Sequence, residues 1–363
     1  MKLPAGPAPR PEIASLPAYS RAAGAATVKW RASSNESVLP PPPPVLAAIA
    51  AAGADAQLYP TVFGDGLADD IAARLGVDVT QVVVGGGSLA LLQQALLAYT
   101  GPGREVVFAW RSYEAYPILV GMAGADAVPV PLGAGSIHDL EAMLGAITEN
   151  TAAVIVCNPN NPTGTEVDAR KLERFLSRVP PTVLVLLDEA YKEFAVGHLD
   201  SLRLLGVYPN LALLGTFSKA YGLAGLRAGY LVASTNIADT LRKSALPFGL
   251  NAVAEAAARA AWADAGHVHR LVELVTEGRK RLSAGLHERG LGTLPSGANF
   301  VWIPLPTGAR ELAECCLARG VSVRAFDGEG VRVTVGERAA EDAVLAAVDD
   351  FLRQDNATRP VGQ

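Results

Sequence analysis

Cysteine is scarce in this sequence: only Cys157, Cys315 and Cys316 occur among 363 residues, and no two form a CxxC pair. This suits a reducing compartment better than a disulfide framework, and we expect no metal site. No stretch reaches the ~18 apolar residues that a membrane-spanning helix needs. The first residues contain one lysine and several prolines, but not the apolar core of a signal peptide. These absences predict a soluble, cytoplasmic protein without a membrane partner.

Positive charge is also limited. The formal net charge is -5, from 31 Lys and Arg against 36 Asp and Glu, and basic residues form no local run. A nucleic-acid surface needs a basic face, so the composition argues against nucleic-acid binding. At 363 residues, half of them hydrophobic, the chain is long enough for two packed domains.

Short apolar segments alternate with helical segments between Gln81 and about Ala233. They are rich in Val and Leu and show no polar alternation, which is typical of strands buried on both faces of a mostly parallel sheet. The pattern predicts an α/β domain that binds ligands outside the carboxyl ends of its strands. We expect seven strands, at Gln81–Val84, Glu105–Ala109, Ala127–Val130, Ala153–Val156, Val183–Leu187, Leu211–Leu214 and Gly229–Ala233.

Beyond about Asn251 the pattern becomes that of a smaller α+β unit. Its expected helices are 252–265, 268–289, Ala309–Arg319 and Glu337–Arg353, and its expected strands are Asn299–Ile303, Val321–Ala325 and Val331–Val335. The run Pro40–Pro44 predicts a stiff, extended polyproline connector into a helix near Val45, and a ligand for a proline-binding module is the alternative. We therefore expect an N-terminal arm (1–44), a large domain (45–257) and a small domain (258–363).

A lysine, Lys219, lies just beyond the expected strand Leu211–Leu214, where such a sheet presents its ligand. The hydroxyls of Thr216 and Ser218 and the cation of Arg227 would together suit a phosphate group. Taken alone, the segment fits a solvated loop lysine about as well.

Asp188 follows five consecutive apolar residues, so its carboxylate must be paired or functional. It could cap a helix N-terminus, or it could pair with a protonated ring nitrogen, as pyridoxal phosphate chemistry requires. Tyr191, expected one helical turn further on, would direct its hydroxyl to the same place or would simply pack. Asn161, in the segment NPNNPTG, either belongs to a rigid turn or donates its amide to a phenolate oxygen.

The turn Gly85-Gly86-Gly87-Ser88 links an expected strand to a helix at Leu89–Tyr99. Bare glycines and a helix N-terminus favour phosphate binding. The third glycine of a dinucleotide fingerprint is absent, and no GK[ST] follows as in a Walker A loop. Tyr113 could stack on a planar ring or pack in the core. Arg324 and Arg332 could clamp a carboxylate or phosphate, or form surface salt bridges.

In combination these segments resemble one family. NPNNPTG at 158–164, DEAY at 188–191, TFSKAYGLAGLR at 216–227, VRVTVG at 331–336 and Tyr59-Pro60 resemble the pyridoxal-phosphate-dependent aminotransferases of fold type I, in the histidinol-phosphate aminotransferase subfamily. The resemblance extends from about Tyr19 to Val335. GGGSLALLQQ at 85–94, VVFAWRSYEAYP at 106–117, ANFVW at 298–302 and DGEGVRVTV at 327–335 resemble its actinobacterial branch of aromatic, or phenylalanine, aminotransferases.

The resemblance implies a role for each site residue. Lys219 would be the Schiff-base lysine and would then move a proton between Cα and C4′, while Asp188 pairs with the pyridinium nitrogen. Asn161 and Tyr191 would hydrogen-bond the ring hydroxyl oxygen, and Tyr113 would stack on the ring. The implied phosphate ligands are Gly86, Gly87, Ser88, Thr216, Ser218, Arg227 and, from the other subunit of a homodimer, Tyr59. Arg332 would bind the substrate α-carboxylate, with Tyr19, Asn35 and Arg324 beside the substrate.

The implied reaction moves the amino group of an aromatic amino acid to 2-oxoglutarate, and histidinol phosphate is the alternative donor. Decarboxylation or β-elimination with the same cofactor, a cofactor-binding regulator and a nicotinamide dehydrogenase are further alternatives. The sequence departs from many relatives at three places. Gly215 stands where many have Arg, Leu89 stands where many have an acidic residue, and SSNES at 33–37 replaces SNENP.

Overall fold

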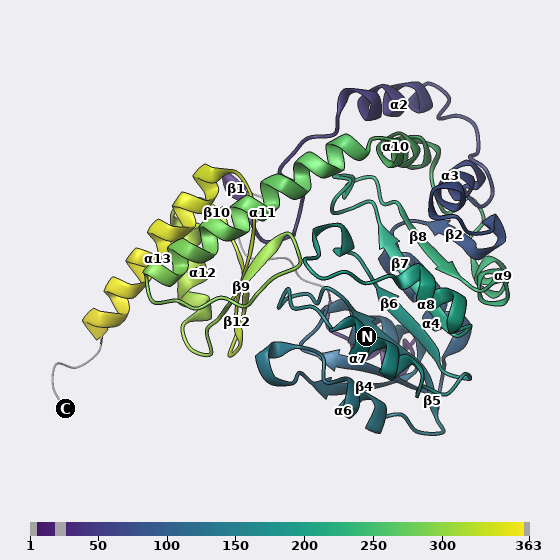
Figure 1. Cartoon of the computed structure of the whole chain (residues 1–363), viewed down its shortest axis with the longest axis horizontal. Coiled ribbons are helices and arrows are strands. Elements are labelled where there is room, and N and C mark those ends of the chain that lie inside the picture. The colour runs from purple at the N-terminus through teal and green to yellow at the C-terminus, as the bar shows by residue number, and fades with distance from the viewer. Residues whose placement is uncertain (1–5, 19–26, 359–363) are drawn as a thin grey trace, which may run out of the picture.

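The computed structural model describes residues 6–18 and 27–358, and side chains to residue 354. Its larger part is built on a seven-stranded sheet flanked by helices (Figure 1). The strand order is β2-β8-β7-β6-β5-β3-β4. The strands are β2 (Val82–Gly85), β3 (Glu105–Trp110), β4 (Asp126–Pro131), β5 (Thr151–Cys157), β6 (Leu184–Asp188), β7 (Leu211–Thr216) and β8 (Gly229–Ala233).

Only β8 runs against its neighbours in this sheet, since β8 pairs antiparallel with β2 and β7 and every other pair is parallel. All seven strands lie at the predicted places, and the expectation of a mostly parallel sheet is confirmed. The carboxyl ends of β3, β5, β6 and β7 therefore lie at one edge, where the polar segments predicted to carry function begin.

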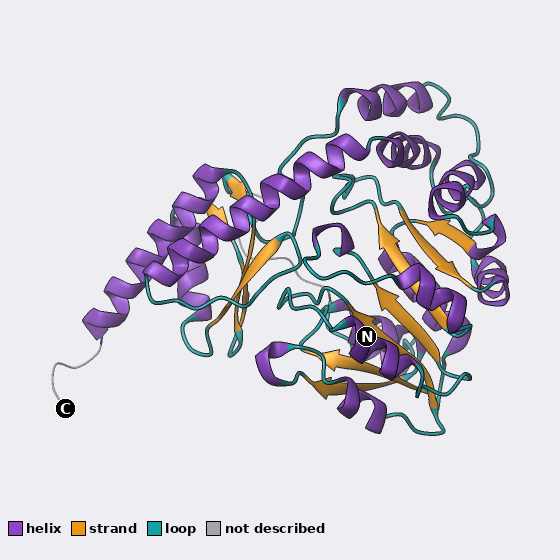
Figure 2. Cartoon of the chain, viewed as in Figure 1, coloured by secondary structure: helices purple, strands orange, loops and turns teal. Residues whose placement is uncertain are grey.

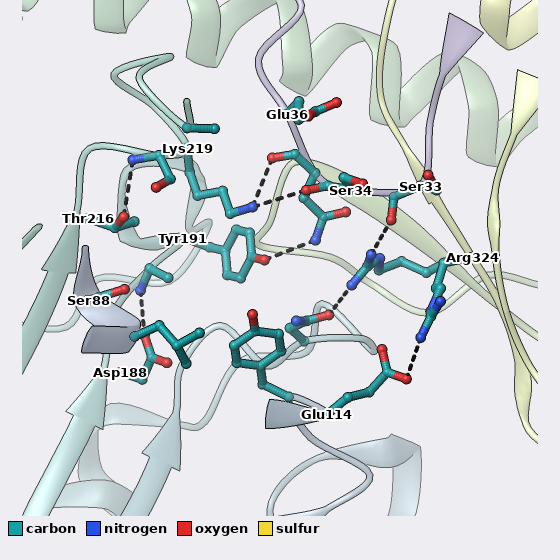
Figure 3. A pocket seen from close by; sticks show the side chains of 18 of the residues that line it. Ser33, Ser34, Glu36, Ser88, Glu114, Asp188, Tyr191, Thr216, Lys219 and Arg324 are labelled. Carbon is teal, nitrogen blue, oxygen red and sulfur yellow. Dashed lines mark hydrogen bonds and ion pairs between the residues drawn. The ribbon is translucent and has the colours of Figure 1, made fainter. Parts of the chain in front are cut away.

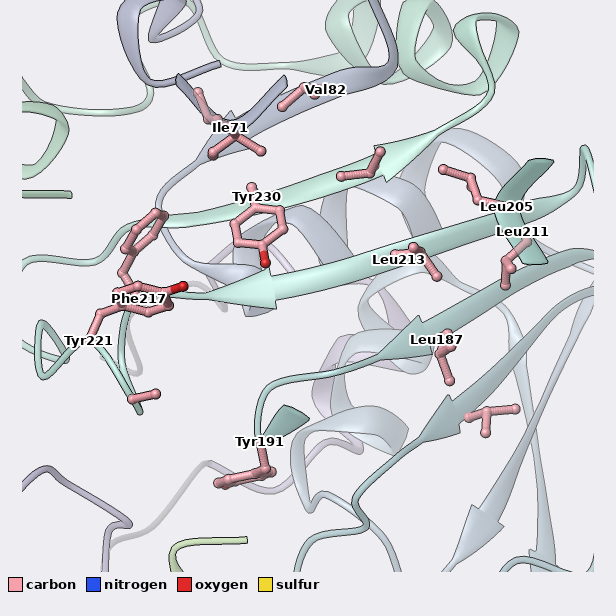
Figure 4. Close-up of a cluster of buried hydrophobic side chains, with 14 of the residues drawn as sticks. Ile71, Val82, Leu187, Tyr191, Leu205, Leu211, Leu213, Phe217, Tyr221 and Tyr230 are labelled. Atoms are coloured by element: carbon pink, nitrogen blue, oxygen red, sulfur yellow. The ribbon is translucent and has the colours of Figure 1, made fainter. Parts of the chain in front are cut away.

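Burial on both faces explains the continuous apolar strand segments. Along β6, Val185 and Leu187 face one hydrophobic core, whereas Leu184 and Leu186 face the other. Figure 4 shows part of the first core, with Leu187 of β6, Leu213 of β7 and Tyr230 of β8 on successive strands of the sheet. The first core includes residues of α3 (Asp65–Leu75), α7 (Ala169–Leu176), α8 (Ser201–Val207) and α10 (Ala252–Ala263). The second includes residues of α4 (Ser88–Tyr99), α5 (Ala115–Ala123) and α9 (Thr235–Ser244).

The polyproline prediction was wrong for its last two residues. Pro43 and Pro44 form the first turn of α2 (Pro43–Gly53), and only Pro40–Pro42 precede the helix. Proline fits there because the first helical N–H groups have no intrahelical acceptor, and because its φ is already helical. The helix packs against α10, so the run leads directly into the large domain.

The smaller part contains a three-stranded antiparallel sheet, in the order β11-β12-β9, and helices that pack around it (Figure 2). The strands are β9 (Phe300–Pro304), β11 (Arg324–Phe326) and β12 (Gly330–Thr334), and the helices are α11 (Ala265–Glu288), α12 (Ala309–Ala318) and α13 (Arg338–Thr358). The predicted single strand Val321–Ala325 was wrong. It divides at Val323 into β11 and a separate strand, β10 (Val321–Ser322).

The N-terminal arm belongs to both parts of the molecule. Besides the short α1 (Pro11–Ala14), it contains β1 (Trp30–Arg31), which pairs in parallel with β10 of the smaller part. The chain then passes Ser33–Glu36 on its way to α2 and the large sheet. The predicted division at 257/258 falls within α10, which packs on α2 and α3, and the domain limits stay a prediction.

Among residues 6–18 and 27–358, no helix is both long and apolar enough to cross a bilayer.

Candidate active site

A cavity of about 680 Å³ lies at the carboxyl edge of the large sheet, bounded by strands of both sheets and by the segment that follows β1 (Figure 3). Most of the predicted site residues line it, although they are far apart in the sequence. They are Asn35, Ser88, Tyr113, Asn161, Asp188, Tyr191, Thr216, Ser218, Lys219, Arg227, Arg324 and Arg332.

The Lys219 amine is held inside this cavity by carbonyl oxygens. Its Nζ donates to the oxygen of Ser34 at 3.2 Å and to that of Asn35 at 3.1 Å, and it lies 5.6 Å from the centre of the Tyr191 ring. Burial, followed by the nearby positive charge of Arg332, lowers the pKa of Lys219 to about 7. A substantial fraction of the amine is therefore neutral near pH 7 and able to act as a nucleophile or base.

The Asp188 carboxylate lies at the buried end of the cavity, as the last residue of β6. Oδ2 accepts a 2.7 Å hydrogen bond from the Tyr116 hydroxyl, and Oδ1 accepts one of 3.2 Å from the N–H of Ala190. Burial raises the pKa of Asp188, whereas these hydrogen bonds lower it. A carboxylate with this limited support is suited to pairing with a cationic ligand group.

Sequence reasoning missed Tyr116 as the partner of Asp188. The residue lies in the first turn of α5, three positions beyond Tyr113, and the two rings meet edge to face with their centres 5.7 Å apart. That spacing was visible in the sequence, but no sequence signal connected it with a carboxylate 72 positions away.

Tyr191 and Asn161 are each tied to another pocket residue. The Tyr191 hydroxyl accepts a 2.9 Å hydrogen bond from Asn35 Nδ2, and Asn161 Oδ1 accepts one from Arg332. Tyr191 stands before a short 3₁₀ helix, Lys192–Phe194, so the expected α-helical turn after Asp188 was wrong. The hydroxyl nevertheless reaches the cavity from this turn.

A network centred on Asn160 joins the loops that carry Tyr113 and Asn161. Asn160 Oδ1 accepts a 2.7 Å hydrogen bond from Ser112 Oγ, and its Nδ2 donates to the carbonyl oxygen of Arg111 at 3.1 Å. All of these groups are buried or partly buried, so the network fixes the loop after β3 against the loop after β5.

Donors for an anion gather at the N-terminus of α4. Arg227 Nη1 donates to Ser218 Oγ at 3.1 Å, and the Ser218 N–H donates to Thr216 Oγ1 at 3.1 Å. Gly87 has φ +100°, and a Cβ atom there would lie 2.6 Å from Arg227 Nη2, so glycine permits the close approach. Two hydroxyls, a guanidinium and a helix N-terminus therefore converge as a phosphate would require.

Three predicted residues that the structure describes, Gly86, Gly87 and Tyr59, do not line the cavity. Gly86 belongs to the turn that precedes Ser88, and a Cβ atom added to it would lie 3.7 Å from the Gly249 oxygen. Tyr59 is 84% exposed and stacks on Phe248, with ring centres 4.8 Å apart. Tyr19 lies outside the described residues.

The departure at Gly215 has a packing explanation. A Cβ at this buried position in β7 would come within 2.1 Å of the Tyr230 ring. The ring fills the space that a larger residue would need, so Gly215 and Tyr230 fit each other.

The cavity fits pyridoxal phosphate, the cofactor that the resemblance implies. Its donor set places an amine of lowered pKa, a buried carboxylate and a cluster suited to phosphate around one space of about 680 Å³. The volume is within the range of small-molecule sites.

Comparison with known proteins agrees with this geometry. The sequence profile of the family "Aminotransferase class I and II" matches residues 28–348. Aromatic amino acid aminotransferases of Streptomyces avermitilis and Corynebacterium jeikeium are 45% and 46% identical to this chain. The first match covers 95% of this chain and 98% of the relative, and the second covers 94% of each.

A solved structure of histidinol-phosphate aminotransferase from Sinorhizobium meliloti, in complex with pyridoxal-5'-phosphate, is 31% identical. It superposes with a TM-score of 0.89 over 97% of this chain and 99% of the other. The predicted fold type is confirmed, and with a profile match over most of its length the chain belongs to the aminotransferase class I and II family.

Proposed function

We propose that this pyridoxal-phosphate-dependent aminotransferase moves the amino group of an aromatic, phenylalanine-like amino acid to 2-oxoglutarate. The products are an aromatic 2-oxo acid and glutamate. The observation that carries this choice of donor is the 45% identity to an aromatic amino acid aminotransferase over nearly the whole length of both chains. The likeness to a histidinol-phosphate aminotransferase structure, at 31% identity, favours the second candidate donor, histidinol phosphate.

Pyridoxal phosphate, when bound, supplies an aldehyde that takes up the amino group and a ring that withdraws electrons from Cα. Asp188 would keep a proton on the ring nitrogen, because a buried carboxylate is stabilised by a cationic partner. Ser88, Thr216, Ser218 and Arg227 would hold the phosphate. The position of these residues in the cavity lining supports the proposed roles.

Lys219 would hold the cofactor and then carry the proton that leaves Cα. With a pKa of about 7, the amine can accept that proton and return it without a large free-energy difference between its two forms. Arg332 would bind the substrate α-carboxylate, and its hydrogen bonds to Asn161 and to the Ser33 carbonyl oxygen fix the guanidinium. A fixed guanidinium would hold the substrate in one orientation relative to the amine that must receive the proton.

The protein would act as a homodimer. Two loops carry exposed apolar side chains, and they are joined by a hydrogen bond from the Phe248 N–H to the Val62 oxygen. The exposed apolar residues are Leu58, Tyr59, Val62, Phe63, Leu246 and Phe248. Exposed apolar side chains grouped on adjoining loops are typical of protein interfaces. The second loop continues to Gly249, whose carbonyl oxygen lies 3.7 Å from the place that a Cβ would take at Gly86, in the turn that leads to Ser88. A partner on this surface would therefore approach the residues expected to bind phosphate, and Tyr59 would reach its neighbour's site.

The lowered pKa of Lys219 gives a pH prediction. In the apoenzyme, the rate of combination with pyridoxal, which lacks the phosphate and its titration, should rise with pH up to about 7 and then level off. Rapid-mixing absorbance measures this rate, and Lys219→Ala is the blank. A rate that keeps rising toward pH 10.5, the ordinary value for lysine, contradicts a buried, destabilised ammonium.

The donor is tested by steady-state kinetics with 2-oxoglutarate as acceptor. We expect kcat/KM for phenylalanine to exceed that for histidinol phosphate by about tenfold or more, because an aromatic side chain needs no counter-charge in the pocket. The reverse order would assign the second candidate donor. Loss of donor without consumption of 2-oxoglutarate would reject transamination altogether.

Dimerisation is tested at the apolar surface. Leu246→Asp, at a side chain 81% exposed, should raise the dimer dissociation constant by about 30-fold or more, because the interface would bury an unpaired charge. Sedimentation velocity over a concentration series measures the change. Val196→Asp, at a residue 78% exposed on a different loop, is the matched control. An unchanged dimer in both variants would place the interface elsewhere.

A further inference from the structure

One ion pair forms part of the cavity wall. Arg324 Nη2, from β11, lies 2.7 Å from Glu114 Oε1, and Glu114 immediately precedes α5 (Figure 3). Both residues line the cavity, and their side chains are only 15% and 27% exposed. Sequence reasoning placed Arg324 beside the substrate and gave Glu114 no role, so its carboxylate changes how the wall is expected to interact with substrate.

Pairing with Glu114 matters for substrate binding because Arg324 lies beside a second arginine. Arg324 is directly opposite Arg332 in the β11–β12 pairing, and both guanidiniums lie near the ring of Phe326, at 5.8 and 6.0 Å. Two adjacent cations would form a strong site for a substrate with two anionic groups. Glu114 supplies a fixed negative charge at one of them.

A donor with an anionic side chain would meet this wall unfavourably. The phosphate or carboxylate of such a donor could bind Arg324 in two ways. It could displace Glu114, which would leave the poorly hydrated Glu114 carboxylate unpaired, or it could bind beside Glu114 and be repelled by its charge. An aromatic side chain requires neither change, and Leu89, Tyr113 and the cavity side of the ion pair give it surface to contact. The pair therefore discriminates by charge as well as by shape.

We propose that Glu114 is a specificity-determining residue, which pairs with Arg324 and so disfavours substrates with an anionic side chain relative to aromatic ones. The inference deepens the proposed function and rests on it for the identity of the aromatic donor. The acceptor 2-oxoglutarate carries a second carboxylate and meets the same wall, so removing the Glu114 charge favours it too.

The test is Glu114→Gln, which keeps the shape and removes the charge. The kcat/KM ratio of histidinol phosphate to phenylalanine should rise by about tenfold or more, mainly through KM, and the KM for 2-oxoglutarate should fall. In the double variant Glu114→Gln/Arg324→Gln the gain should disappear, because it depends on the released guanidinium. A gain that survives removal of Arg324 overturns the proposal, as does an unchanged ratio in Glu114→Gln.

A matched control exists at a second ion pair outside the cavity lining. Glu329 accepts from Arg111 Nε at 2.9 Å and links the same loop to the β11–β12 hairpin. Glu329→Gln should leave the donor ratio unchanged. An equal rise in this variant would show that loosening the contact between the two sheets, and not the charge at Glu114, causes the effect.

Equilibrium binding separates this proposal from the donor assignment. Calorimetry on the holoenzyme would measure glutarate, with two carboxylates, and 3-phenylpropionate, with one carboxylate and a ring. Glu114→Gln should tighten glutarate by about tenfold relative to 3-phenylpropionate. The binding result can be interpreted even if the wild-type protein does not turn over phenylalanine. Equal changes in affinity for both ligands would reject the role of Glu114.

Discussion

The enclosure of one amine and one carboxylate in the same cavity is the constraint on which the rest of this structure depends. Lys219 and Asp188 each resist burial as charged groups, and the fold compensates them differently. Carbonyl oxygens of Ser34 and Asn35 hold the amine, while the Tyr116 hydroxyl and the Ala190 N–H hold the carboxylate. The cavity is thus prepared for a ligand that combines with an amine and presents a cation to a carboxylate.

Both groups reach this cavity because parallel strands end at one edge. β6 ends at Asp188 and β7 at Thr216, three residues before Lys219, and these strands are neighbours. The sequence could reveal this much, since continuous apolar segments predict buried parallel strands and the polar residues after them predict the ligand edge. For the same reason the cluster of Thr216, Ser218 and Arg227 was predictable from one short segment.

Partners distant in sequence were not predictable. Tyr116 bonds Asp188 and Glu114 bonds Arg324 across 72 and 210 positions, and no local pattern encodes such contacts. The division of Val321–Ala325 into two strands was hidden because every residue has a strand-compatible side chain, and the break depends on pairing with β1. The last prolines of Pro40–Pro44 were misassigned because proline suits both an extended segment and a helical first turn.

The decisive measurement is to identify the lysine that holds the cofactor. Borohydride reduction of the holoenzyme makes that link permanent, and peptide mass spectrometry then locates it. We expect the pyridoxyl mass on the peptide that contains Lys219, and on no peptide of a Lys219→Ala variant. The same mass on another lysine, such as Lys192 or Lys243, would contradict the arrangement around Asp188.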